Sequence, residues 1–270
     1  MAAFKRLFFD IETSYCQGWF WRPSFKTQIS YDQIIKQAAI ICICYKWEGS
    51  DRVKNLQWNR GNDKEMVYKF AEIIKDADEV VGHNGDRFDL KWFRTRCLIH
   101  GIKSMPEIKS IDTLKISRSK FNFPSNRLDA IGKYLGFGGK KEHKGIELWH
   151  DIIQRNSKKS MKEMIDYCNR DVELLEKVFI KLEGYTKQKT HMAVEQGGDR
   201  CDCPYCGSEE TQSRRQTTLA SGVIKHKLSC NKCKKYFTIS ASDFRYRTER
   251  KLKREISELN KISKSGLYLE

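Results

Sequence analysis

The segment LFFDIET, at residues 7–13, combines an apolar run with two carboxylates that directly follow it. Its first three residues predict a buried β-strand. Because side chains alternate along a strand with a period of two, Asp10 and Glu12 are expected on one face and Ile11 on the other. Neighbouring carboxylates offer the hard oxygen ligands that divalent cations prefer, so this end of the strand is a candidate cation site.

Two later segments carry further acids in contexts that predict helices. Asp89 lies in GHNGDRFDL, residues 82–90, where a strand is expected to lead into a helix. Asp171 lies in YCNRDVELL, residues 167–175, and Tyr167 precedes it by four residues. Residues four apart lie on neighbouring turns of a helix, so Tyr167 and Asp171 should project toward a common point.

The helix that carries Tyr167 and Asp171 is the clearest in the sequence. It is expected from about residue 158 to residue 184, because apolar residues recur there at spacings of three and four. We expect this apolar stripe to lie on the sheet, with Tyr167 and Asp171 beside it. The stripe consists of Met161, Ile165, Cys168, Val172, Leu175, Phe179 and Leu182.

The remaining pattern predicts an α/β fold in which a mixed sheet is flanked by helices. The first three strands should form an antiparallel start, and later strands alternate with helices. Strands are expected near residues 6–11, 39–47, 53–58, 79–84 and 108–114, and helices near 64–76, 89–93, 127–136 and 158–184. Residues 1–185 are therefore predicted to form the first domain.

The size and charge of the chain limit the class of protein. Its 270 residues can form one sizeable core and a small appendage, but not a polymerase of several domains. A formal net charge of +16 favours a polyanionic partner, and nucleic acid is a better candidate than an anionic membrane.

Membrane insertion and secretion are not expected. The longest near-apolar run, AAIICICY at residues 38–45, is shorter than the roughly 18 residues that a spanning helix needs. Acidic residues enter by position 10, which argues against a signal peptide. We therefore expect a soluble, intracellular protein located in the cytoplasm.

The acids fit the chemistry of phosphodiester hydrolysis. This reaction needs an activated water, neutralisation of the transition state and help for the leaving oxygen, which two divalent ions about 4 Å apart can supply. Oxygen ligands suit two Mg²⁺ or Mn²⁺ ions. Two further acids, Asp112 and Asp129, are better explained as helix caps or turn formers than as ligands.

Three motifs carry a family resemblance. DIET at residues 10–13, Asn84 with the pair at 88–89, and Tyr167 with Asp171 resemble the three exonuclease motifs of the DEDD superfamily. The tyrosine indicates the DEDDy branch, because the sister branch has a histidine where this chain has Asp166.

The resemblance covers roughly residues 4–183 and includes RLDAIGKYLGFGGKK and GIELW, between the second and third motifs. These segments are similar to stand-alone bacterial and phage exonucleases related to the proofreading domain of family B DNA polymerases. The resemblance implies a ribonuclease H-like fold with a mixed sheet of about five strands and the acidic centre at its edge. It also implies 3′ to 5′ hydrolysis that releases nucleoside monophosphates, inside a bacterium or a phage-infected host.

The resemblance implies roles for the motif residues. Asp10, Glu12 and Asp171 would hold the metal ion that activates water, while Asp10 and Asp89 would hold the ion at the leaving oxygen. Tyr167 would position the attacking water through its hydroxyl group.

Substrate contacts are expected at the same motifs and in one loop. Thr13, Asn84 and Phe88 are implied by the resemblance as contacts to the terminal nucleotide or the groups around it. Lys140 and Lys141 lie in the basic loop GFGGKKEHKGIE, which suits the backbone of a nucleic acid strand. An ordinary solvated turn explains that loop nearly as well.

The ten cysteines fall into two groups. Four thiols between residues 203 and 233 have the spacing of two metal-binding knuckles, CPYCG and CNKC, and predict a zinc ribbon with one structural Zn²⁺. The predicted ligands are Cys203, Cys206, Cys230 and Cys233. Cys201 could replace Cys203, but the proline and glycine of CPYCG favour Cys203. The scattered cysteines are best explained as reduced core thiols: Cys16, Cys42, Cys44, Cys97 and Cys168.

The C-terminal third is predicted to contain a linker at residues 186–200, the zinc ribbon at 201–240, and a basic helix with a tail at 241–270. A module this small should need its metal to fold. Lysines interleaved with aromatic residues suit single-stranded nucleic acid, whereas a replication or repair protein is the alternative partner.

Together these features predict a metal-dependent 3′–5′ exonuclease that acts on DNA, at single-stranded or frayed 3′ ends, in replication or repair. A 3′ exoribonuclease acting on RNA and a structure-specific endonuclease are the enzymatic alternatives. A non-catalytic zinc-ribbon adaptor that binds nucleic acid is the alternative from another class. The presence of all four carboxylates argues against the adaptor.

Overall fold

A computed structural model describes residues 4–22, 27–103, 106–138, 145–187 and 189–264 of the chain. Their contacts divide the chain into two compact units, Lys5–Thr186 and a second unit that begins at Lys187. Among the residues so described, no helix combines the length and apolarity that crossing a membrane requires.

The first unit is built on a mixed sheet with the strand order β5-β4-β1-β6-β7, which confirms the predicted α/β class. The strands are β1 (Arg6–Thr13), β4 (Ile40–Trp47), β5 (Lys54–Gln57), β6 (Glu79–Gly82) and β7 (Lys109–Asp112). β1 pairs antiparallel with β4 and parallel with β6, while β4–β5 is antiparallel and β6–β7 is parallel. The strand that carries DIET therefore lies in the middle of the sheet.

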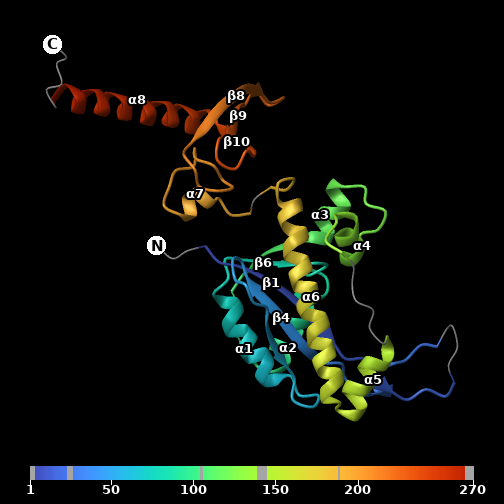
Figure 1. The fold of residues 1–270 in the computed structure, drawn as a ribbon. Helices are drawn as coiled ribbons and strands as arrows, with labels where there is room; N and C mark the ends of the chain where they lie inside the picture. The colour runs from blue at the N-terminus through green and yellow to red at the C-terminus, as the bar shows by residue number, and fades with distance from the viewer. Residues whose placement is uncertain (1–3, 23–26, 104–105, 139–144, 188, 265–270) are drawn as a thin grey trace. The chain divides into compact units, whose positions relative to one another are not determined.

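Helices cover both faces of this sheet (Figure 1). They are α1 (Lys64–Lys75), α2 (Asp89–Ile99), α3 (Thr113–Lys120), α4 (Leu128–Tyr134), α5 (Ile146–Arg155) and α6 (Lys158–Glu183). The long helix α6 lies against β1 and β4, and α3, α4 and α5 pack on it.

Two phenylalanines of β1 show which helices lie on which face. The rings of Phe8 and Phe179 in α6 have centroids 5.6 Å apart, and Phe9 meets Phe70 in α1 at the same distance. Because side chains alternate along β1, Phe8, Asp10 and Glu12 point toward α6, while Phe9 and Ile11 point toward α1 and α2. Burial of these large rings stabilises the unit and sets the register of β1 against its helices.

Several elements were not predicted. They are α3, α5 and a small hairpin between β1 and β4, made of β2 (Gln17–Gly18), a short 3-10 turn (Tyr31–Gln33) and β3 (Ile34–Lys36). The expectation of core thiols is correct for Cys42, Cys44, Cys97 and Cys168, which are buried, but wrong for Cys16, which is exposed next to this hairpin. Cys16 lies between β1 and β2, where the chain has left the main sheet, so the helices that cover the sheet do not bury it.

The second unit contains an antiparallel sheet of three strands and two helices. The elements are α7 (Met192–Glu195), β8 (Thr211–Thr218), β9 (Ile224–Cys230), β10 (Tyr236–Ser240) and α8 (Ala241–Lys264), with the strand order β10-β9-β8. Cys203, Leu228, Cys230 and Phe237 belong to its small buried core. A core this limited makes additional cross-links necessary for independent stability.

The described residues of the segment predicted as a linker, 186–187 and 189–200, include a short helix. This helix is α7, whose Ala193 is buried, and the amide of Met192 donates to the carbonyl of Pro204 at 3.0 Å. The amide of Gly198 donates to the carbonyl of Ala193 at 2.7 Å. The small side chains of Ala193 and Gly198 allow the backbone to pack closely here. A search of the sequence for apolar periodicity does not detect such residues.

Helix α8 is fastened to the rest of its unit by two arginines. The guanidinium group of Arg250 pairs with Asp199 and Asp202, and Nε of Arg247 donates to Oγ1 of Thr211 at 3.0 Å. Burial of Arg247 alone would cost free energy, but its contacts with Thr211 compensate the buried donors.

Candidate functional site

Three of the predicted acids meet between the sheet and α6. Carboxylate oxygens of Asp10, Glu12 and Asp171 all lie within 4.8 Å of one another. The alternation of β1 turns Asp10 and Glu12 toward α6, and α6 supplies Asp171 from its covered face. Three negative charges at such a distance repel one another unless cations or protons compensate them, so the cluster fits a divalent cation.

The position of Asp171 on α6 differs from the prediction. Asp171 is only 6% exposed and lies within the buried face of the helix rather than beside it. Tyr167 is half-buried, and Met161 and Ile165 of the predicted stripe are only partly covered. The apolar pattern located the stripe but could not show that a carboxylate would be placed inside it.

Asp89 lies in the same pocket but outside this group of three. It is in the first turn of α2, is 2% exposed, and its Oδ1 accepts a hydrogen bond from the amide of Ile11 at 2.9 Å. Burial, assisted by the nearby charge of Asp112, raises the pKa of Asp89 to about 7. Asp89 is therefore protonated in a large part of the molecules near neutral pH when no cation is bound.

The four acids line a cavity of about 400 Å³ together with Tyr167 and several other side chains. The predicted contacts Asn84 and Phe88 line it as well. Thr13 is not among the lining residues, and its carbonyl accepts a hydrogen bond from Nε1 of Trp149 at 3.0 Å. The predicted contacts Lys140 and Lys141 lie outside the described residues.

Polar lining residues missed from the sequence include His83, Arg118, Asn126 and Arg127. Asp129, expected as a cap or turn former, also lines the cavity; it lies in the first turn of α4, whose N-cap is Arg127. Arg118 lies on α3, and that helix itself was not predicted. His83 is held by two partners, because its Nδ1 is 2.9 Å from Oγ1 of Thr113 and its Nε2 is 3.0 Å from the carbonyl of Asn126. The position of His83 directly before Asn84 in the second motif was the only signal that could have found it.

The backbone at Asn84 is left-handed, and Asp112 holds it in place. Asn84 has a φ of +67°, a conformation that is uncommon for residues other than glycine. Its amide donates to Oδ1 of Asp112 at 2.9 Å, and the same carboxylate caps α3 by accepting from the amides of Leu114 and Lys115. The expected capping role of Asp112 is confirmed, and the cap also fixes the turn that leads to Asp89.

A buried thiol lies directly behind the acidic group. Sγ of Cys168 in α6 is 3.5 Å from Oδ2 of Asp10 and 3.6 Å from its carbonyl oxygen. Burial raises the pKa of Cys168 well above its ordinary value, so the thiol keeps its proton and donates it toward Asp10. Cys42 and Cys44 of β4 lie beside it and are buried too.

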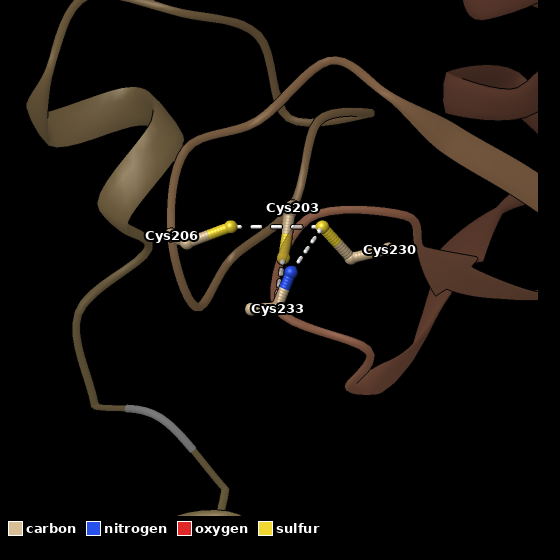
Figure 2. Close-up of side chains that lie close together, drawn as sticks. All are labelled: Cys203, Cys206, Cys230 and Cys233. Carbon is tan, nitrogen blue, oxygen red and sulfur yellow. Dashed lines mark hydrogen bonds between the residues drawn. The ribbon is translucent and has the colours of Figure 1, made fainter.

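The second unit holds a separate cluster of four thiols, which Figure 2 shows in close-up. The sulfur atoms of Cys203 and Cys233 are 3.6 Å apart, as are those of Cys206 and Cys230. Disulfide sulfurs would be about 2.05 Å apart, so these are separate thiols. A tetrahedral zinc site with bonds of about 2.3 Å has sulfur–sulfur edges of about 3.8 Å, which the cluster matches closely.

The spare cysteine does not join this cluster. Cys201 instead groups with Asp199 and Asp202, the two acids that pair with Arg250. The two knuckles alone thus offer a complete set of four thiolates for one ion. Such a set suits a structural zinc site, which keeps no position open for a substrate.

Comparisons with known proteins agree with the fold of the first unit. The model of a family described as RNase_H superfamily matches residues 32–183. A DNA polymerase of Thermococcus hydrothermalis is 28% identical over 170 residues, which cover 51% of this chain and 9% of that protein. A DNA polymerase of Pyrococcus glycovorans is 26% identical over 197 residues, or 59% of this chain and 23% of that protein.

A DNA polymerase of Thermococcus litoralis is 27% identical over 201 residues, covering 62% of this chain and 11% of that protein. The chain thus spans less than a quarter of the length of these three relatives. The family match supports a nuclease-type function, and the acidic group could hold a metal ion.

Proposed function

The chain belongs to the RNase_H superfamily, and from that membership and its acidic pocket we propose that it is a 3′–5′ exonuclease of the DEDDy branch that shortens DNA from single-stranded or frayed ends. The observation that carries the proposal is the meeting of Asp10, Glu12 and Asp171 within 4.8 Å, with Asp89 and Tyr167 in the same cavity. The similarity to DNA polymerases favours DNA over RNA as the substrate.

The carboxylates are proposed to hold two Mg²⁺ or Mn²⁺ ions. When bound, such ions supply an activated water and neutralise negative charge on the phosphate and the leaving oxygen. Asp10, Glu12 and Asp171 would hold one ion, and Asp10 and Asp89, which line the same cavity, would hold the other. Asp89 must release its proton to bind a cation, since its pKa is raised to about 7 in the ion-free pocket.

Other lining residues are proposed to orient the substrate. The hydroxyl of Tyr167 is proposed to position the attacking water. A correctly oriented reactant lowers the barrier to reaction. Arg118 and Arg127 line the cavity and can pair with the phosphate groups of the strand. Phe88 lines the cavity with its ring partly exposed, and we propose that it contacts the terminal base.

The cysteine cluster is proposed to bind one structural Zn²⁺ through Cys203, Cys206, Cys230 and Cys233. The second unit would then hold nucleic acid, since Lys225, Lys227 and the exposed Arg245, Lys251 and Lys253 of α8 supply positive charge. A replication or repair protein is the alternative partner. Zinc-bound cysteines must stay reduced, which fits an intracellular location for the protein.

The test compares three proteins: the wild type, Asp10→Ala, and Asp166→Asn as a control that removes an exposed acid one residue before Tyr167. Each is incubated with 5′-labelled single-stranded DNA, duplex DNA, RNA or closed circular DNA, with Mg²⁺, Mn²⁺ or a chelator. The proposal predicts a ladder of shortened products from linear DNA, which requires metal, persists in Asp166→Asn and is lost in Asp10→Ala.

Each other outcome points to a different function. Cleavage of closed circles indicates an endonuclease, and faster shortening of RNA indicates an exoribonuclease. Binding of nucleic acid without any metal-dependent cleavage would overturn the enzymatic proposal in favour of an adaptor.

A further inference from the structure

The hairpin between β1 and β4 carries a cluster of bare aromatic side chains. Trp19 is 72% exposed, Trp21 is fully exposed, Tyr31 is 80% exposed, and Phe20 is more than half exposed. In Figure 1 this blue segment reaches out from the end of β1, away from the layers of the sheet and helices. We call these four residues the aromatic arm.

The base of the arm is ordered by backbone contacts. β2 pairs antiparallel with β3 through Gln17 and Gly18, and the amide of Trp19 donates to the carbonyl of Gln33 at 2.9 Å. A Cβ atom on Gly18 would lie 2.7 Å from the carbonyl oxygen of Gln33, so this close approach requires glycine. The rings are thus presented from a hydrogen-bonded base rather than from a free chain.

The arm does not belong to the core of its unit. Trp19 and Trp21 are largely exposed and Phe20 is about half exposed, and none of the three belongs to the buried core. Leaving such large rings in water forgoes the stabilisation that their burial would supply. An exposed apolar cluster of this kind marks a binding surface.

The location and charge of the arm favour nucleic acid as its ligand. Trp19 follows Glu12 by seven residues, and a chain extends by at most about 3.6 Å per residue, so the arm begins within about 25 Å of the acidic cavity. Arg22 and Lys36 are exposed on the two limbs of the hairpin and can meet phosphates. Aromatic faces next to cations are the surface that binds single strands without sequence preference.

We infer that the aromatic arm stacks the unpaired bases of the strand whose end enters the acidic cavity. This inference rests on the proposed function for the identity of the strand, but its test does not require cleavage. Stacking on the arm would select single-stranded over duplex DNA, because paired bases do not offer their faces. The arm would also hold the strand between successive cleavage steps.

The first test measures tryptophan accessibility. The four other tryptophans are buried or half-buried, so acrylamide quenching reports mainly on Trp19 and Trp21. In the full-length Asp10→Ala protein, a 20-nucleotide oligo-dT should protect these two from quenching, and a duplex of the same length should not. Absence of protection by oligo-dT overturns the inference.

The second test uses Trp19→Ala/Trp21→Ala, with Leu98→Ala/Ile99→Ala as a control that removes exposed apolar side chains from α2. The arm variant should bind oligo-dT about tenfold more weakly, the loss expected for one stacked base, and the control should bind like the wild type. Hydrolysis of the p-nitrophenyl ester of thymidine 5′-monophosphate, which has no neighbouring base, should stay unchanged in both.

The outcomes separate the arm from the proposed nuclease. If no protein hydrolyses the ester or DNA, the proposed function fails, while the binding comparison still decides the role of the arm. If ester hydrolysis falls together with binding, the arm supports the fold instead of the substrate, and the inference fails. If oligo-dT binding is unchanged but self-association is lost in gel filtration, the arm binds a second copy of the chain, which overturns the inference.

Discussion

The amide of Ile11 in β1 donates a hydrogen bond to Oδ1 of Asp89 in α2, at 2.9 Å. Ile11 points away from the acidic group, yet its backbone lies between Asp10 and Glu12 and reaches Asp89 from there. This bond ties the start of α2 to the strand that carries the first two acids. It also explains how four carboxylates from two faces of the sheet come to line one cavity.

The raised pKa of Asp89 predicts how stability depends on pH without metal. Because its pKa rises from about 3.8 in the unfolded chain to about 7 in the folded protein, the folded state holds an extra proton between these values. The stability contributed by Asp89 is fully present below pH 4 and is lost as pH rises through 7. The Asp89→Asn variant lacks this loss.

The measurement is thermal unfolding in chelator from pH 5 to pH 8. At pH 8, Asp89→Asn should melt at least about 3 °C above the wild type, since about 1 kcal/mol corresponds to 2–4 °C in a unit of this size. Near pH 5 the difference should shrink. Added Mn²⁺ should raise the midpoint of the wild type more than that of the variant, and equal midpoints at pH 8 in chelator would contradict the burial effect.

The thiol of Cys168 is predicted to hold Asp10 in place for cation binding. Removing a weak donor of this kind costs about 0.5–1.5 kcal/mol, so Cys168→Ala should raise the Mn²⁺ concentration for half-maximal activity by about two- to tenfold. The rate at saturating Mn²⁺ should stay close to that of the wild type. Cys168→Ser restores a donor at the same position.

The readout is a Mn²⁺ titration of activity for the three proteins, with unfolding midpoints as a control for the cavity that alanine creates. Serine should restore most of the metal affinity. If serine and alanine behave alike, the thiol contributes by packing and not by its hydrogen bond.

Tyr167→Phe is predicted to lower turnover while leaving cation binding intact. The substitution removes only the hydroxyl group and leaves the four carboxylates that line the cavity in place. We expect kcat to fall by about 10- to 100-fold, as for loss of a group that orients a reactant. Calorimetry of Mn²⁺ binding should match the wild type, and weakened binding would place Tyr167 among the ligands.

The sequence predicted those features that depend on local periodicity. The alternation of β1 placed Asp10 and Glu12 together, the apolar spacing of α6 located the helix that carries Asp171, and the two CxxC knuckles located the thiol cluster. Each of these patterns spans only a few residues. Each can therefore be recognised in the sequence without knowledge of the tertiary fold.

Features that depend on distant contacts were not predictable. Helix α3 is short and polar, and it begins where Asp112 caps it after a contact with Asn84. Asp171 is buried although a carboxylate does not fit the apolar pattern of α6. Such exceptions to a local pattern are expected at functional sites, where a residue serves the site and not the packing of the core. The hairpin below the aromatic arm pairs over too few residues to show a period.

A buried ion pair is predicted to stabilise the first unit. Asp63 is fully buried at the start of α1, and Arg96 of α2 donates to both of its oxygens at 2.7 Å. The amide of Ile40 and the ring of His100 also bond to Asp63. Although burial alone would raise the pKa of Asp63, these bonds hold it below the ordinary value.

Arg96→Met should lower the free energy of unfolding by about 3–5 kcal/mol, because it leaves a buried carboxylate without its cation. Asp63→Asn/Arg96→Met should recover part of that loss. Since the pKa of Asp63 is depressed, its contribution is present above the pKa of the unfolded chain and is lost as pH falls through the folded value. Urea unfolding at pH 7 and at pH 3, which lies below the ordinary pKa of 3.8, measures both effects. A double variant no more stable than Arg96→Met would contradict the pairing.

Metal analysis should find one tightly bound zinc per chain, and two cysteine variants should separate ligand from neighbour. Cys230→Ser removes one of the four clustered sulfurs and should lose the zinc, together with the order of the second unit, because so small a core folds only with its cross-link. Cys201 precedes Cys203 by two residues but groups with Asp199 and Asp202. The Cys201→Ser protein should therefore retain the zinc. Plasma mass spectrometry and amide exchange of residues 201–240 report the two effects. A wild-type second unit that stays protected after exhaustive chelation, or a Cys201→Ser protein that loses its zinc, would rule out this ligand set.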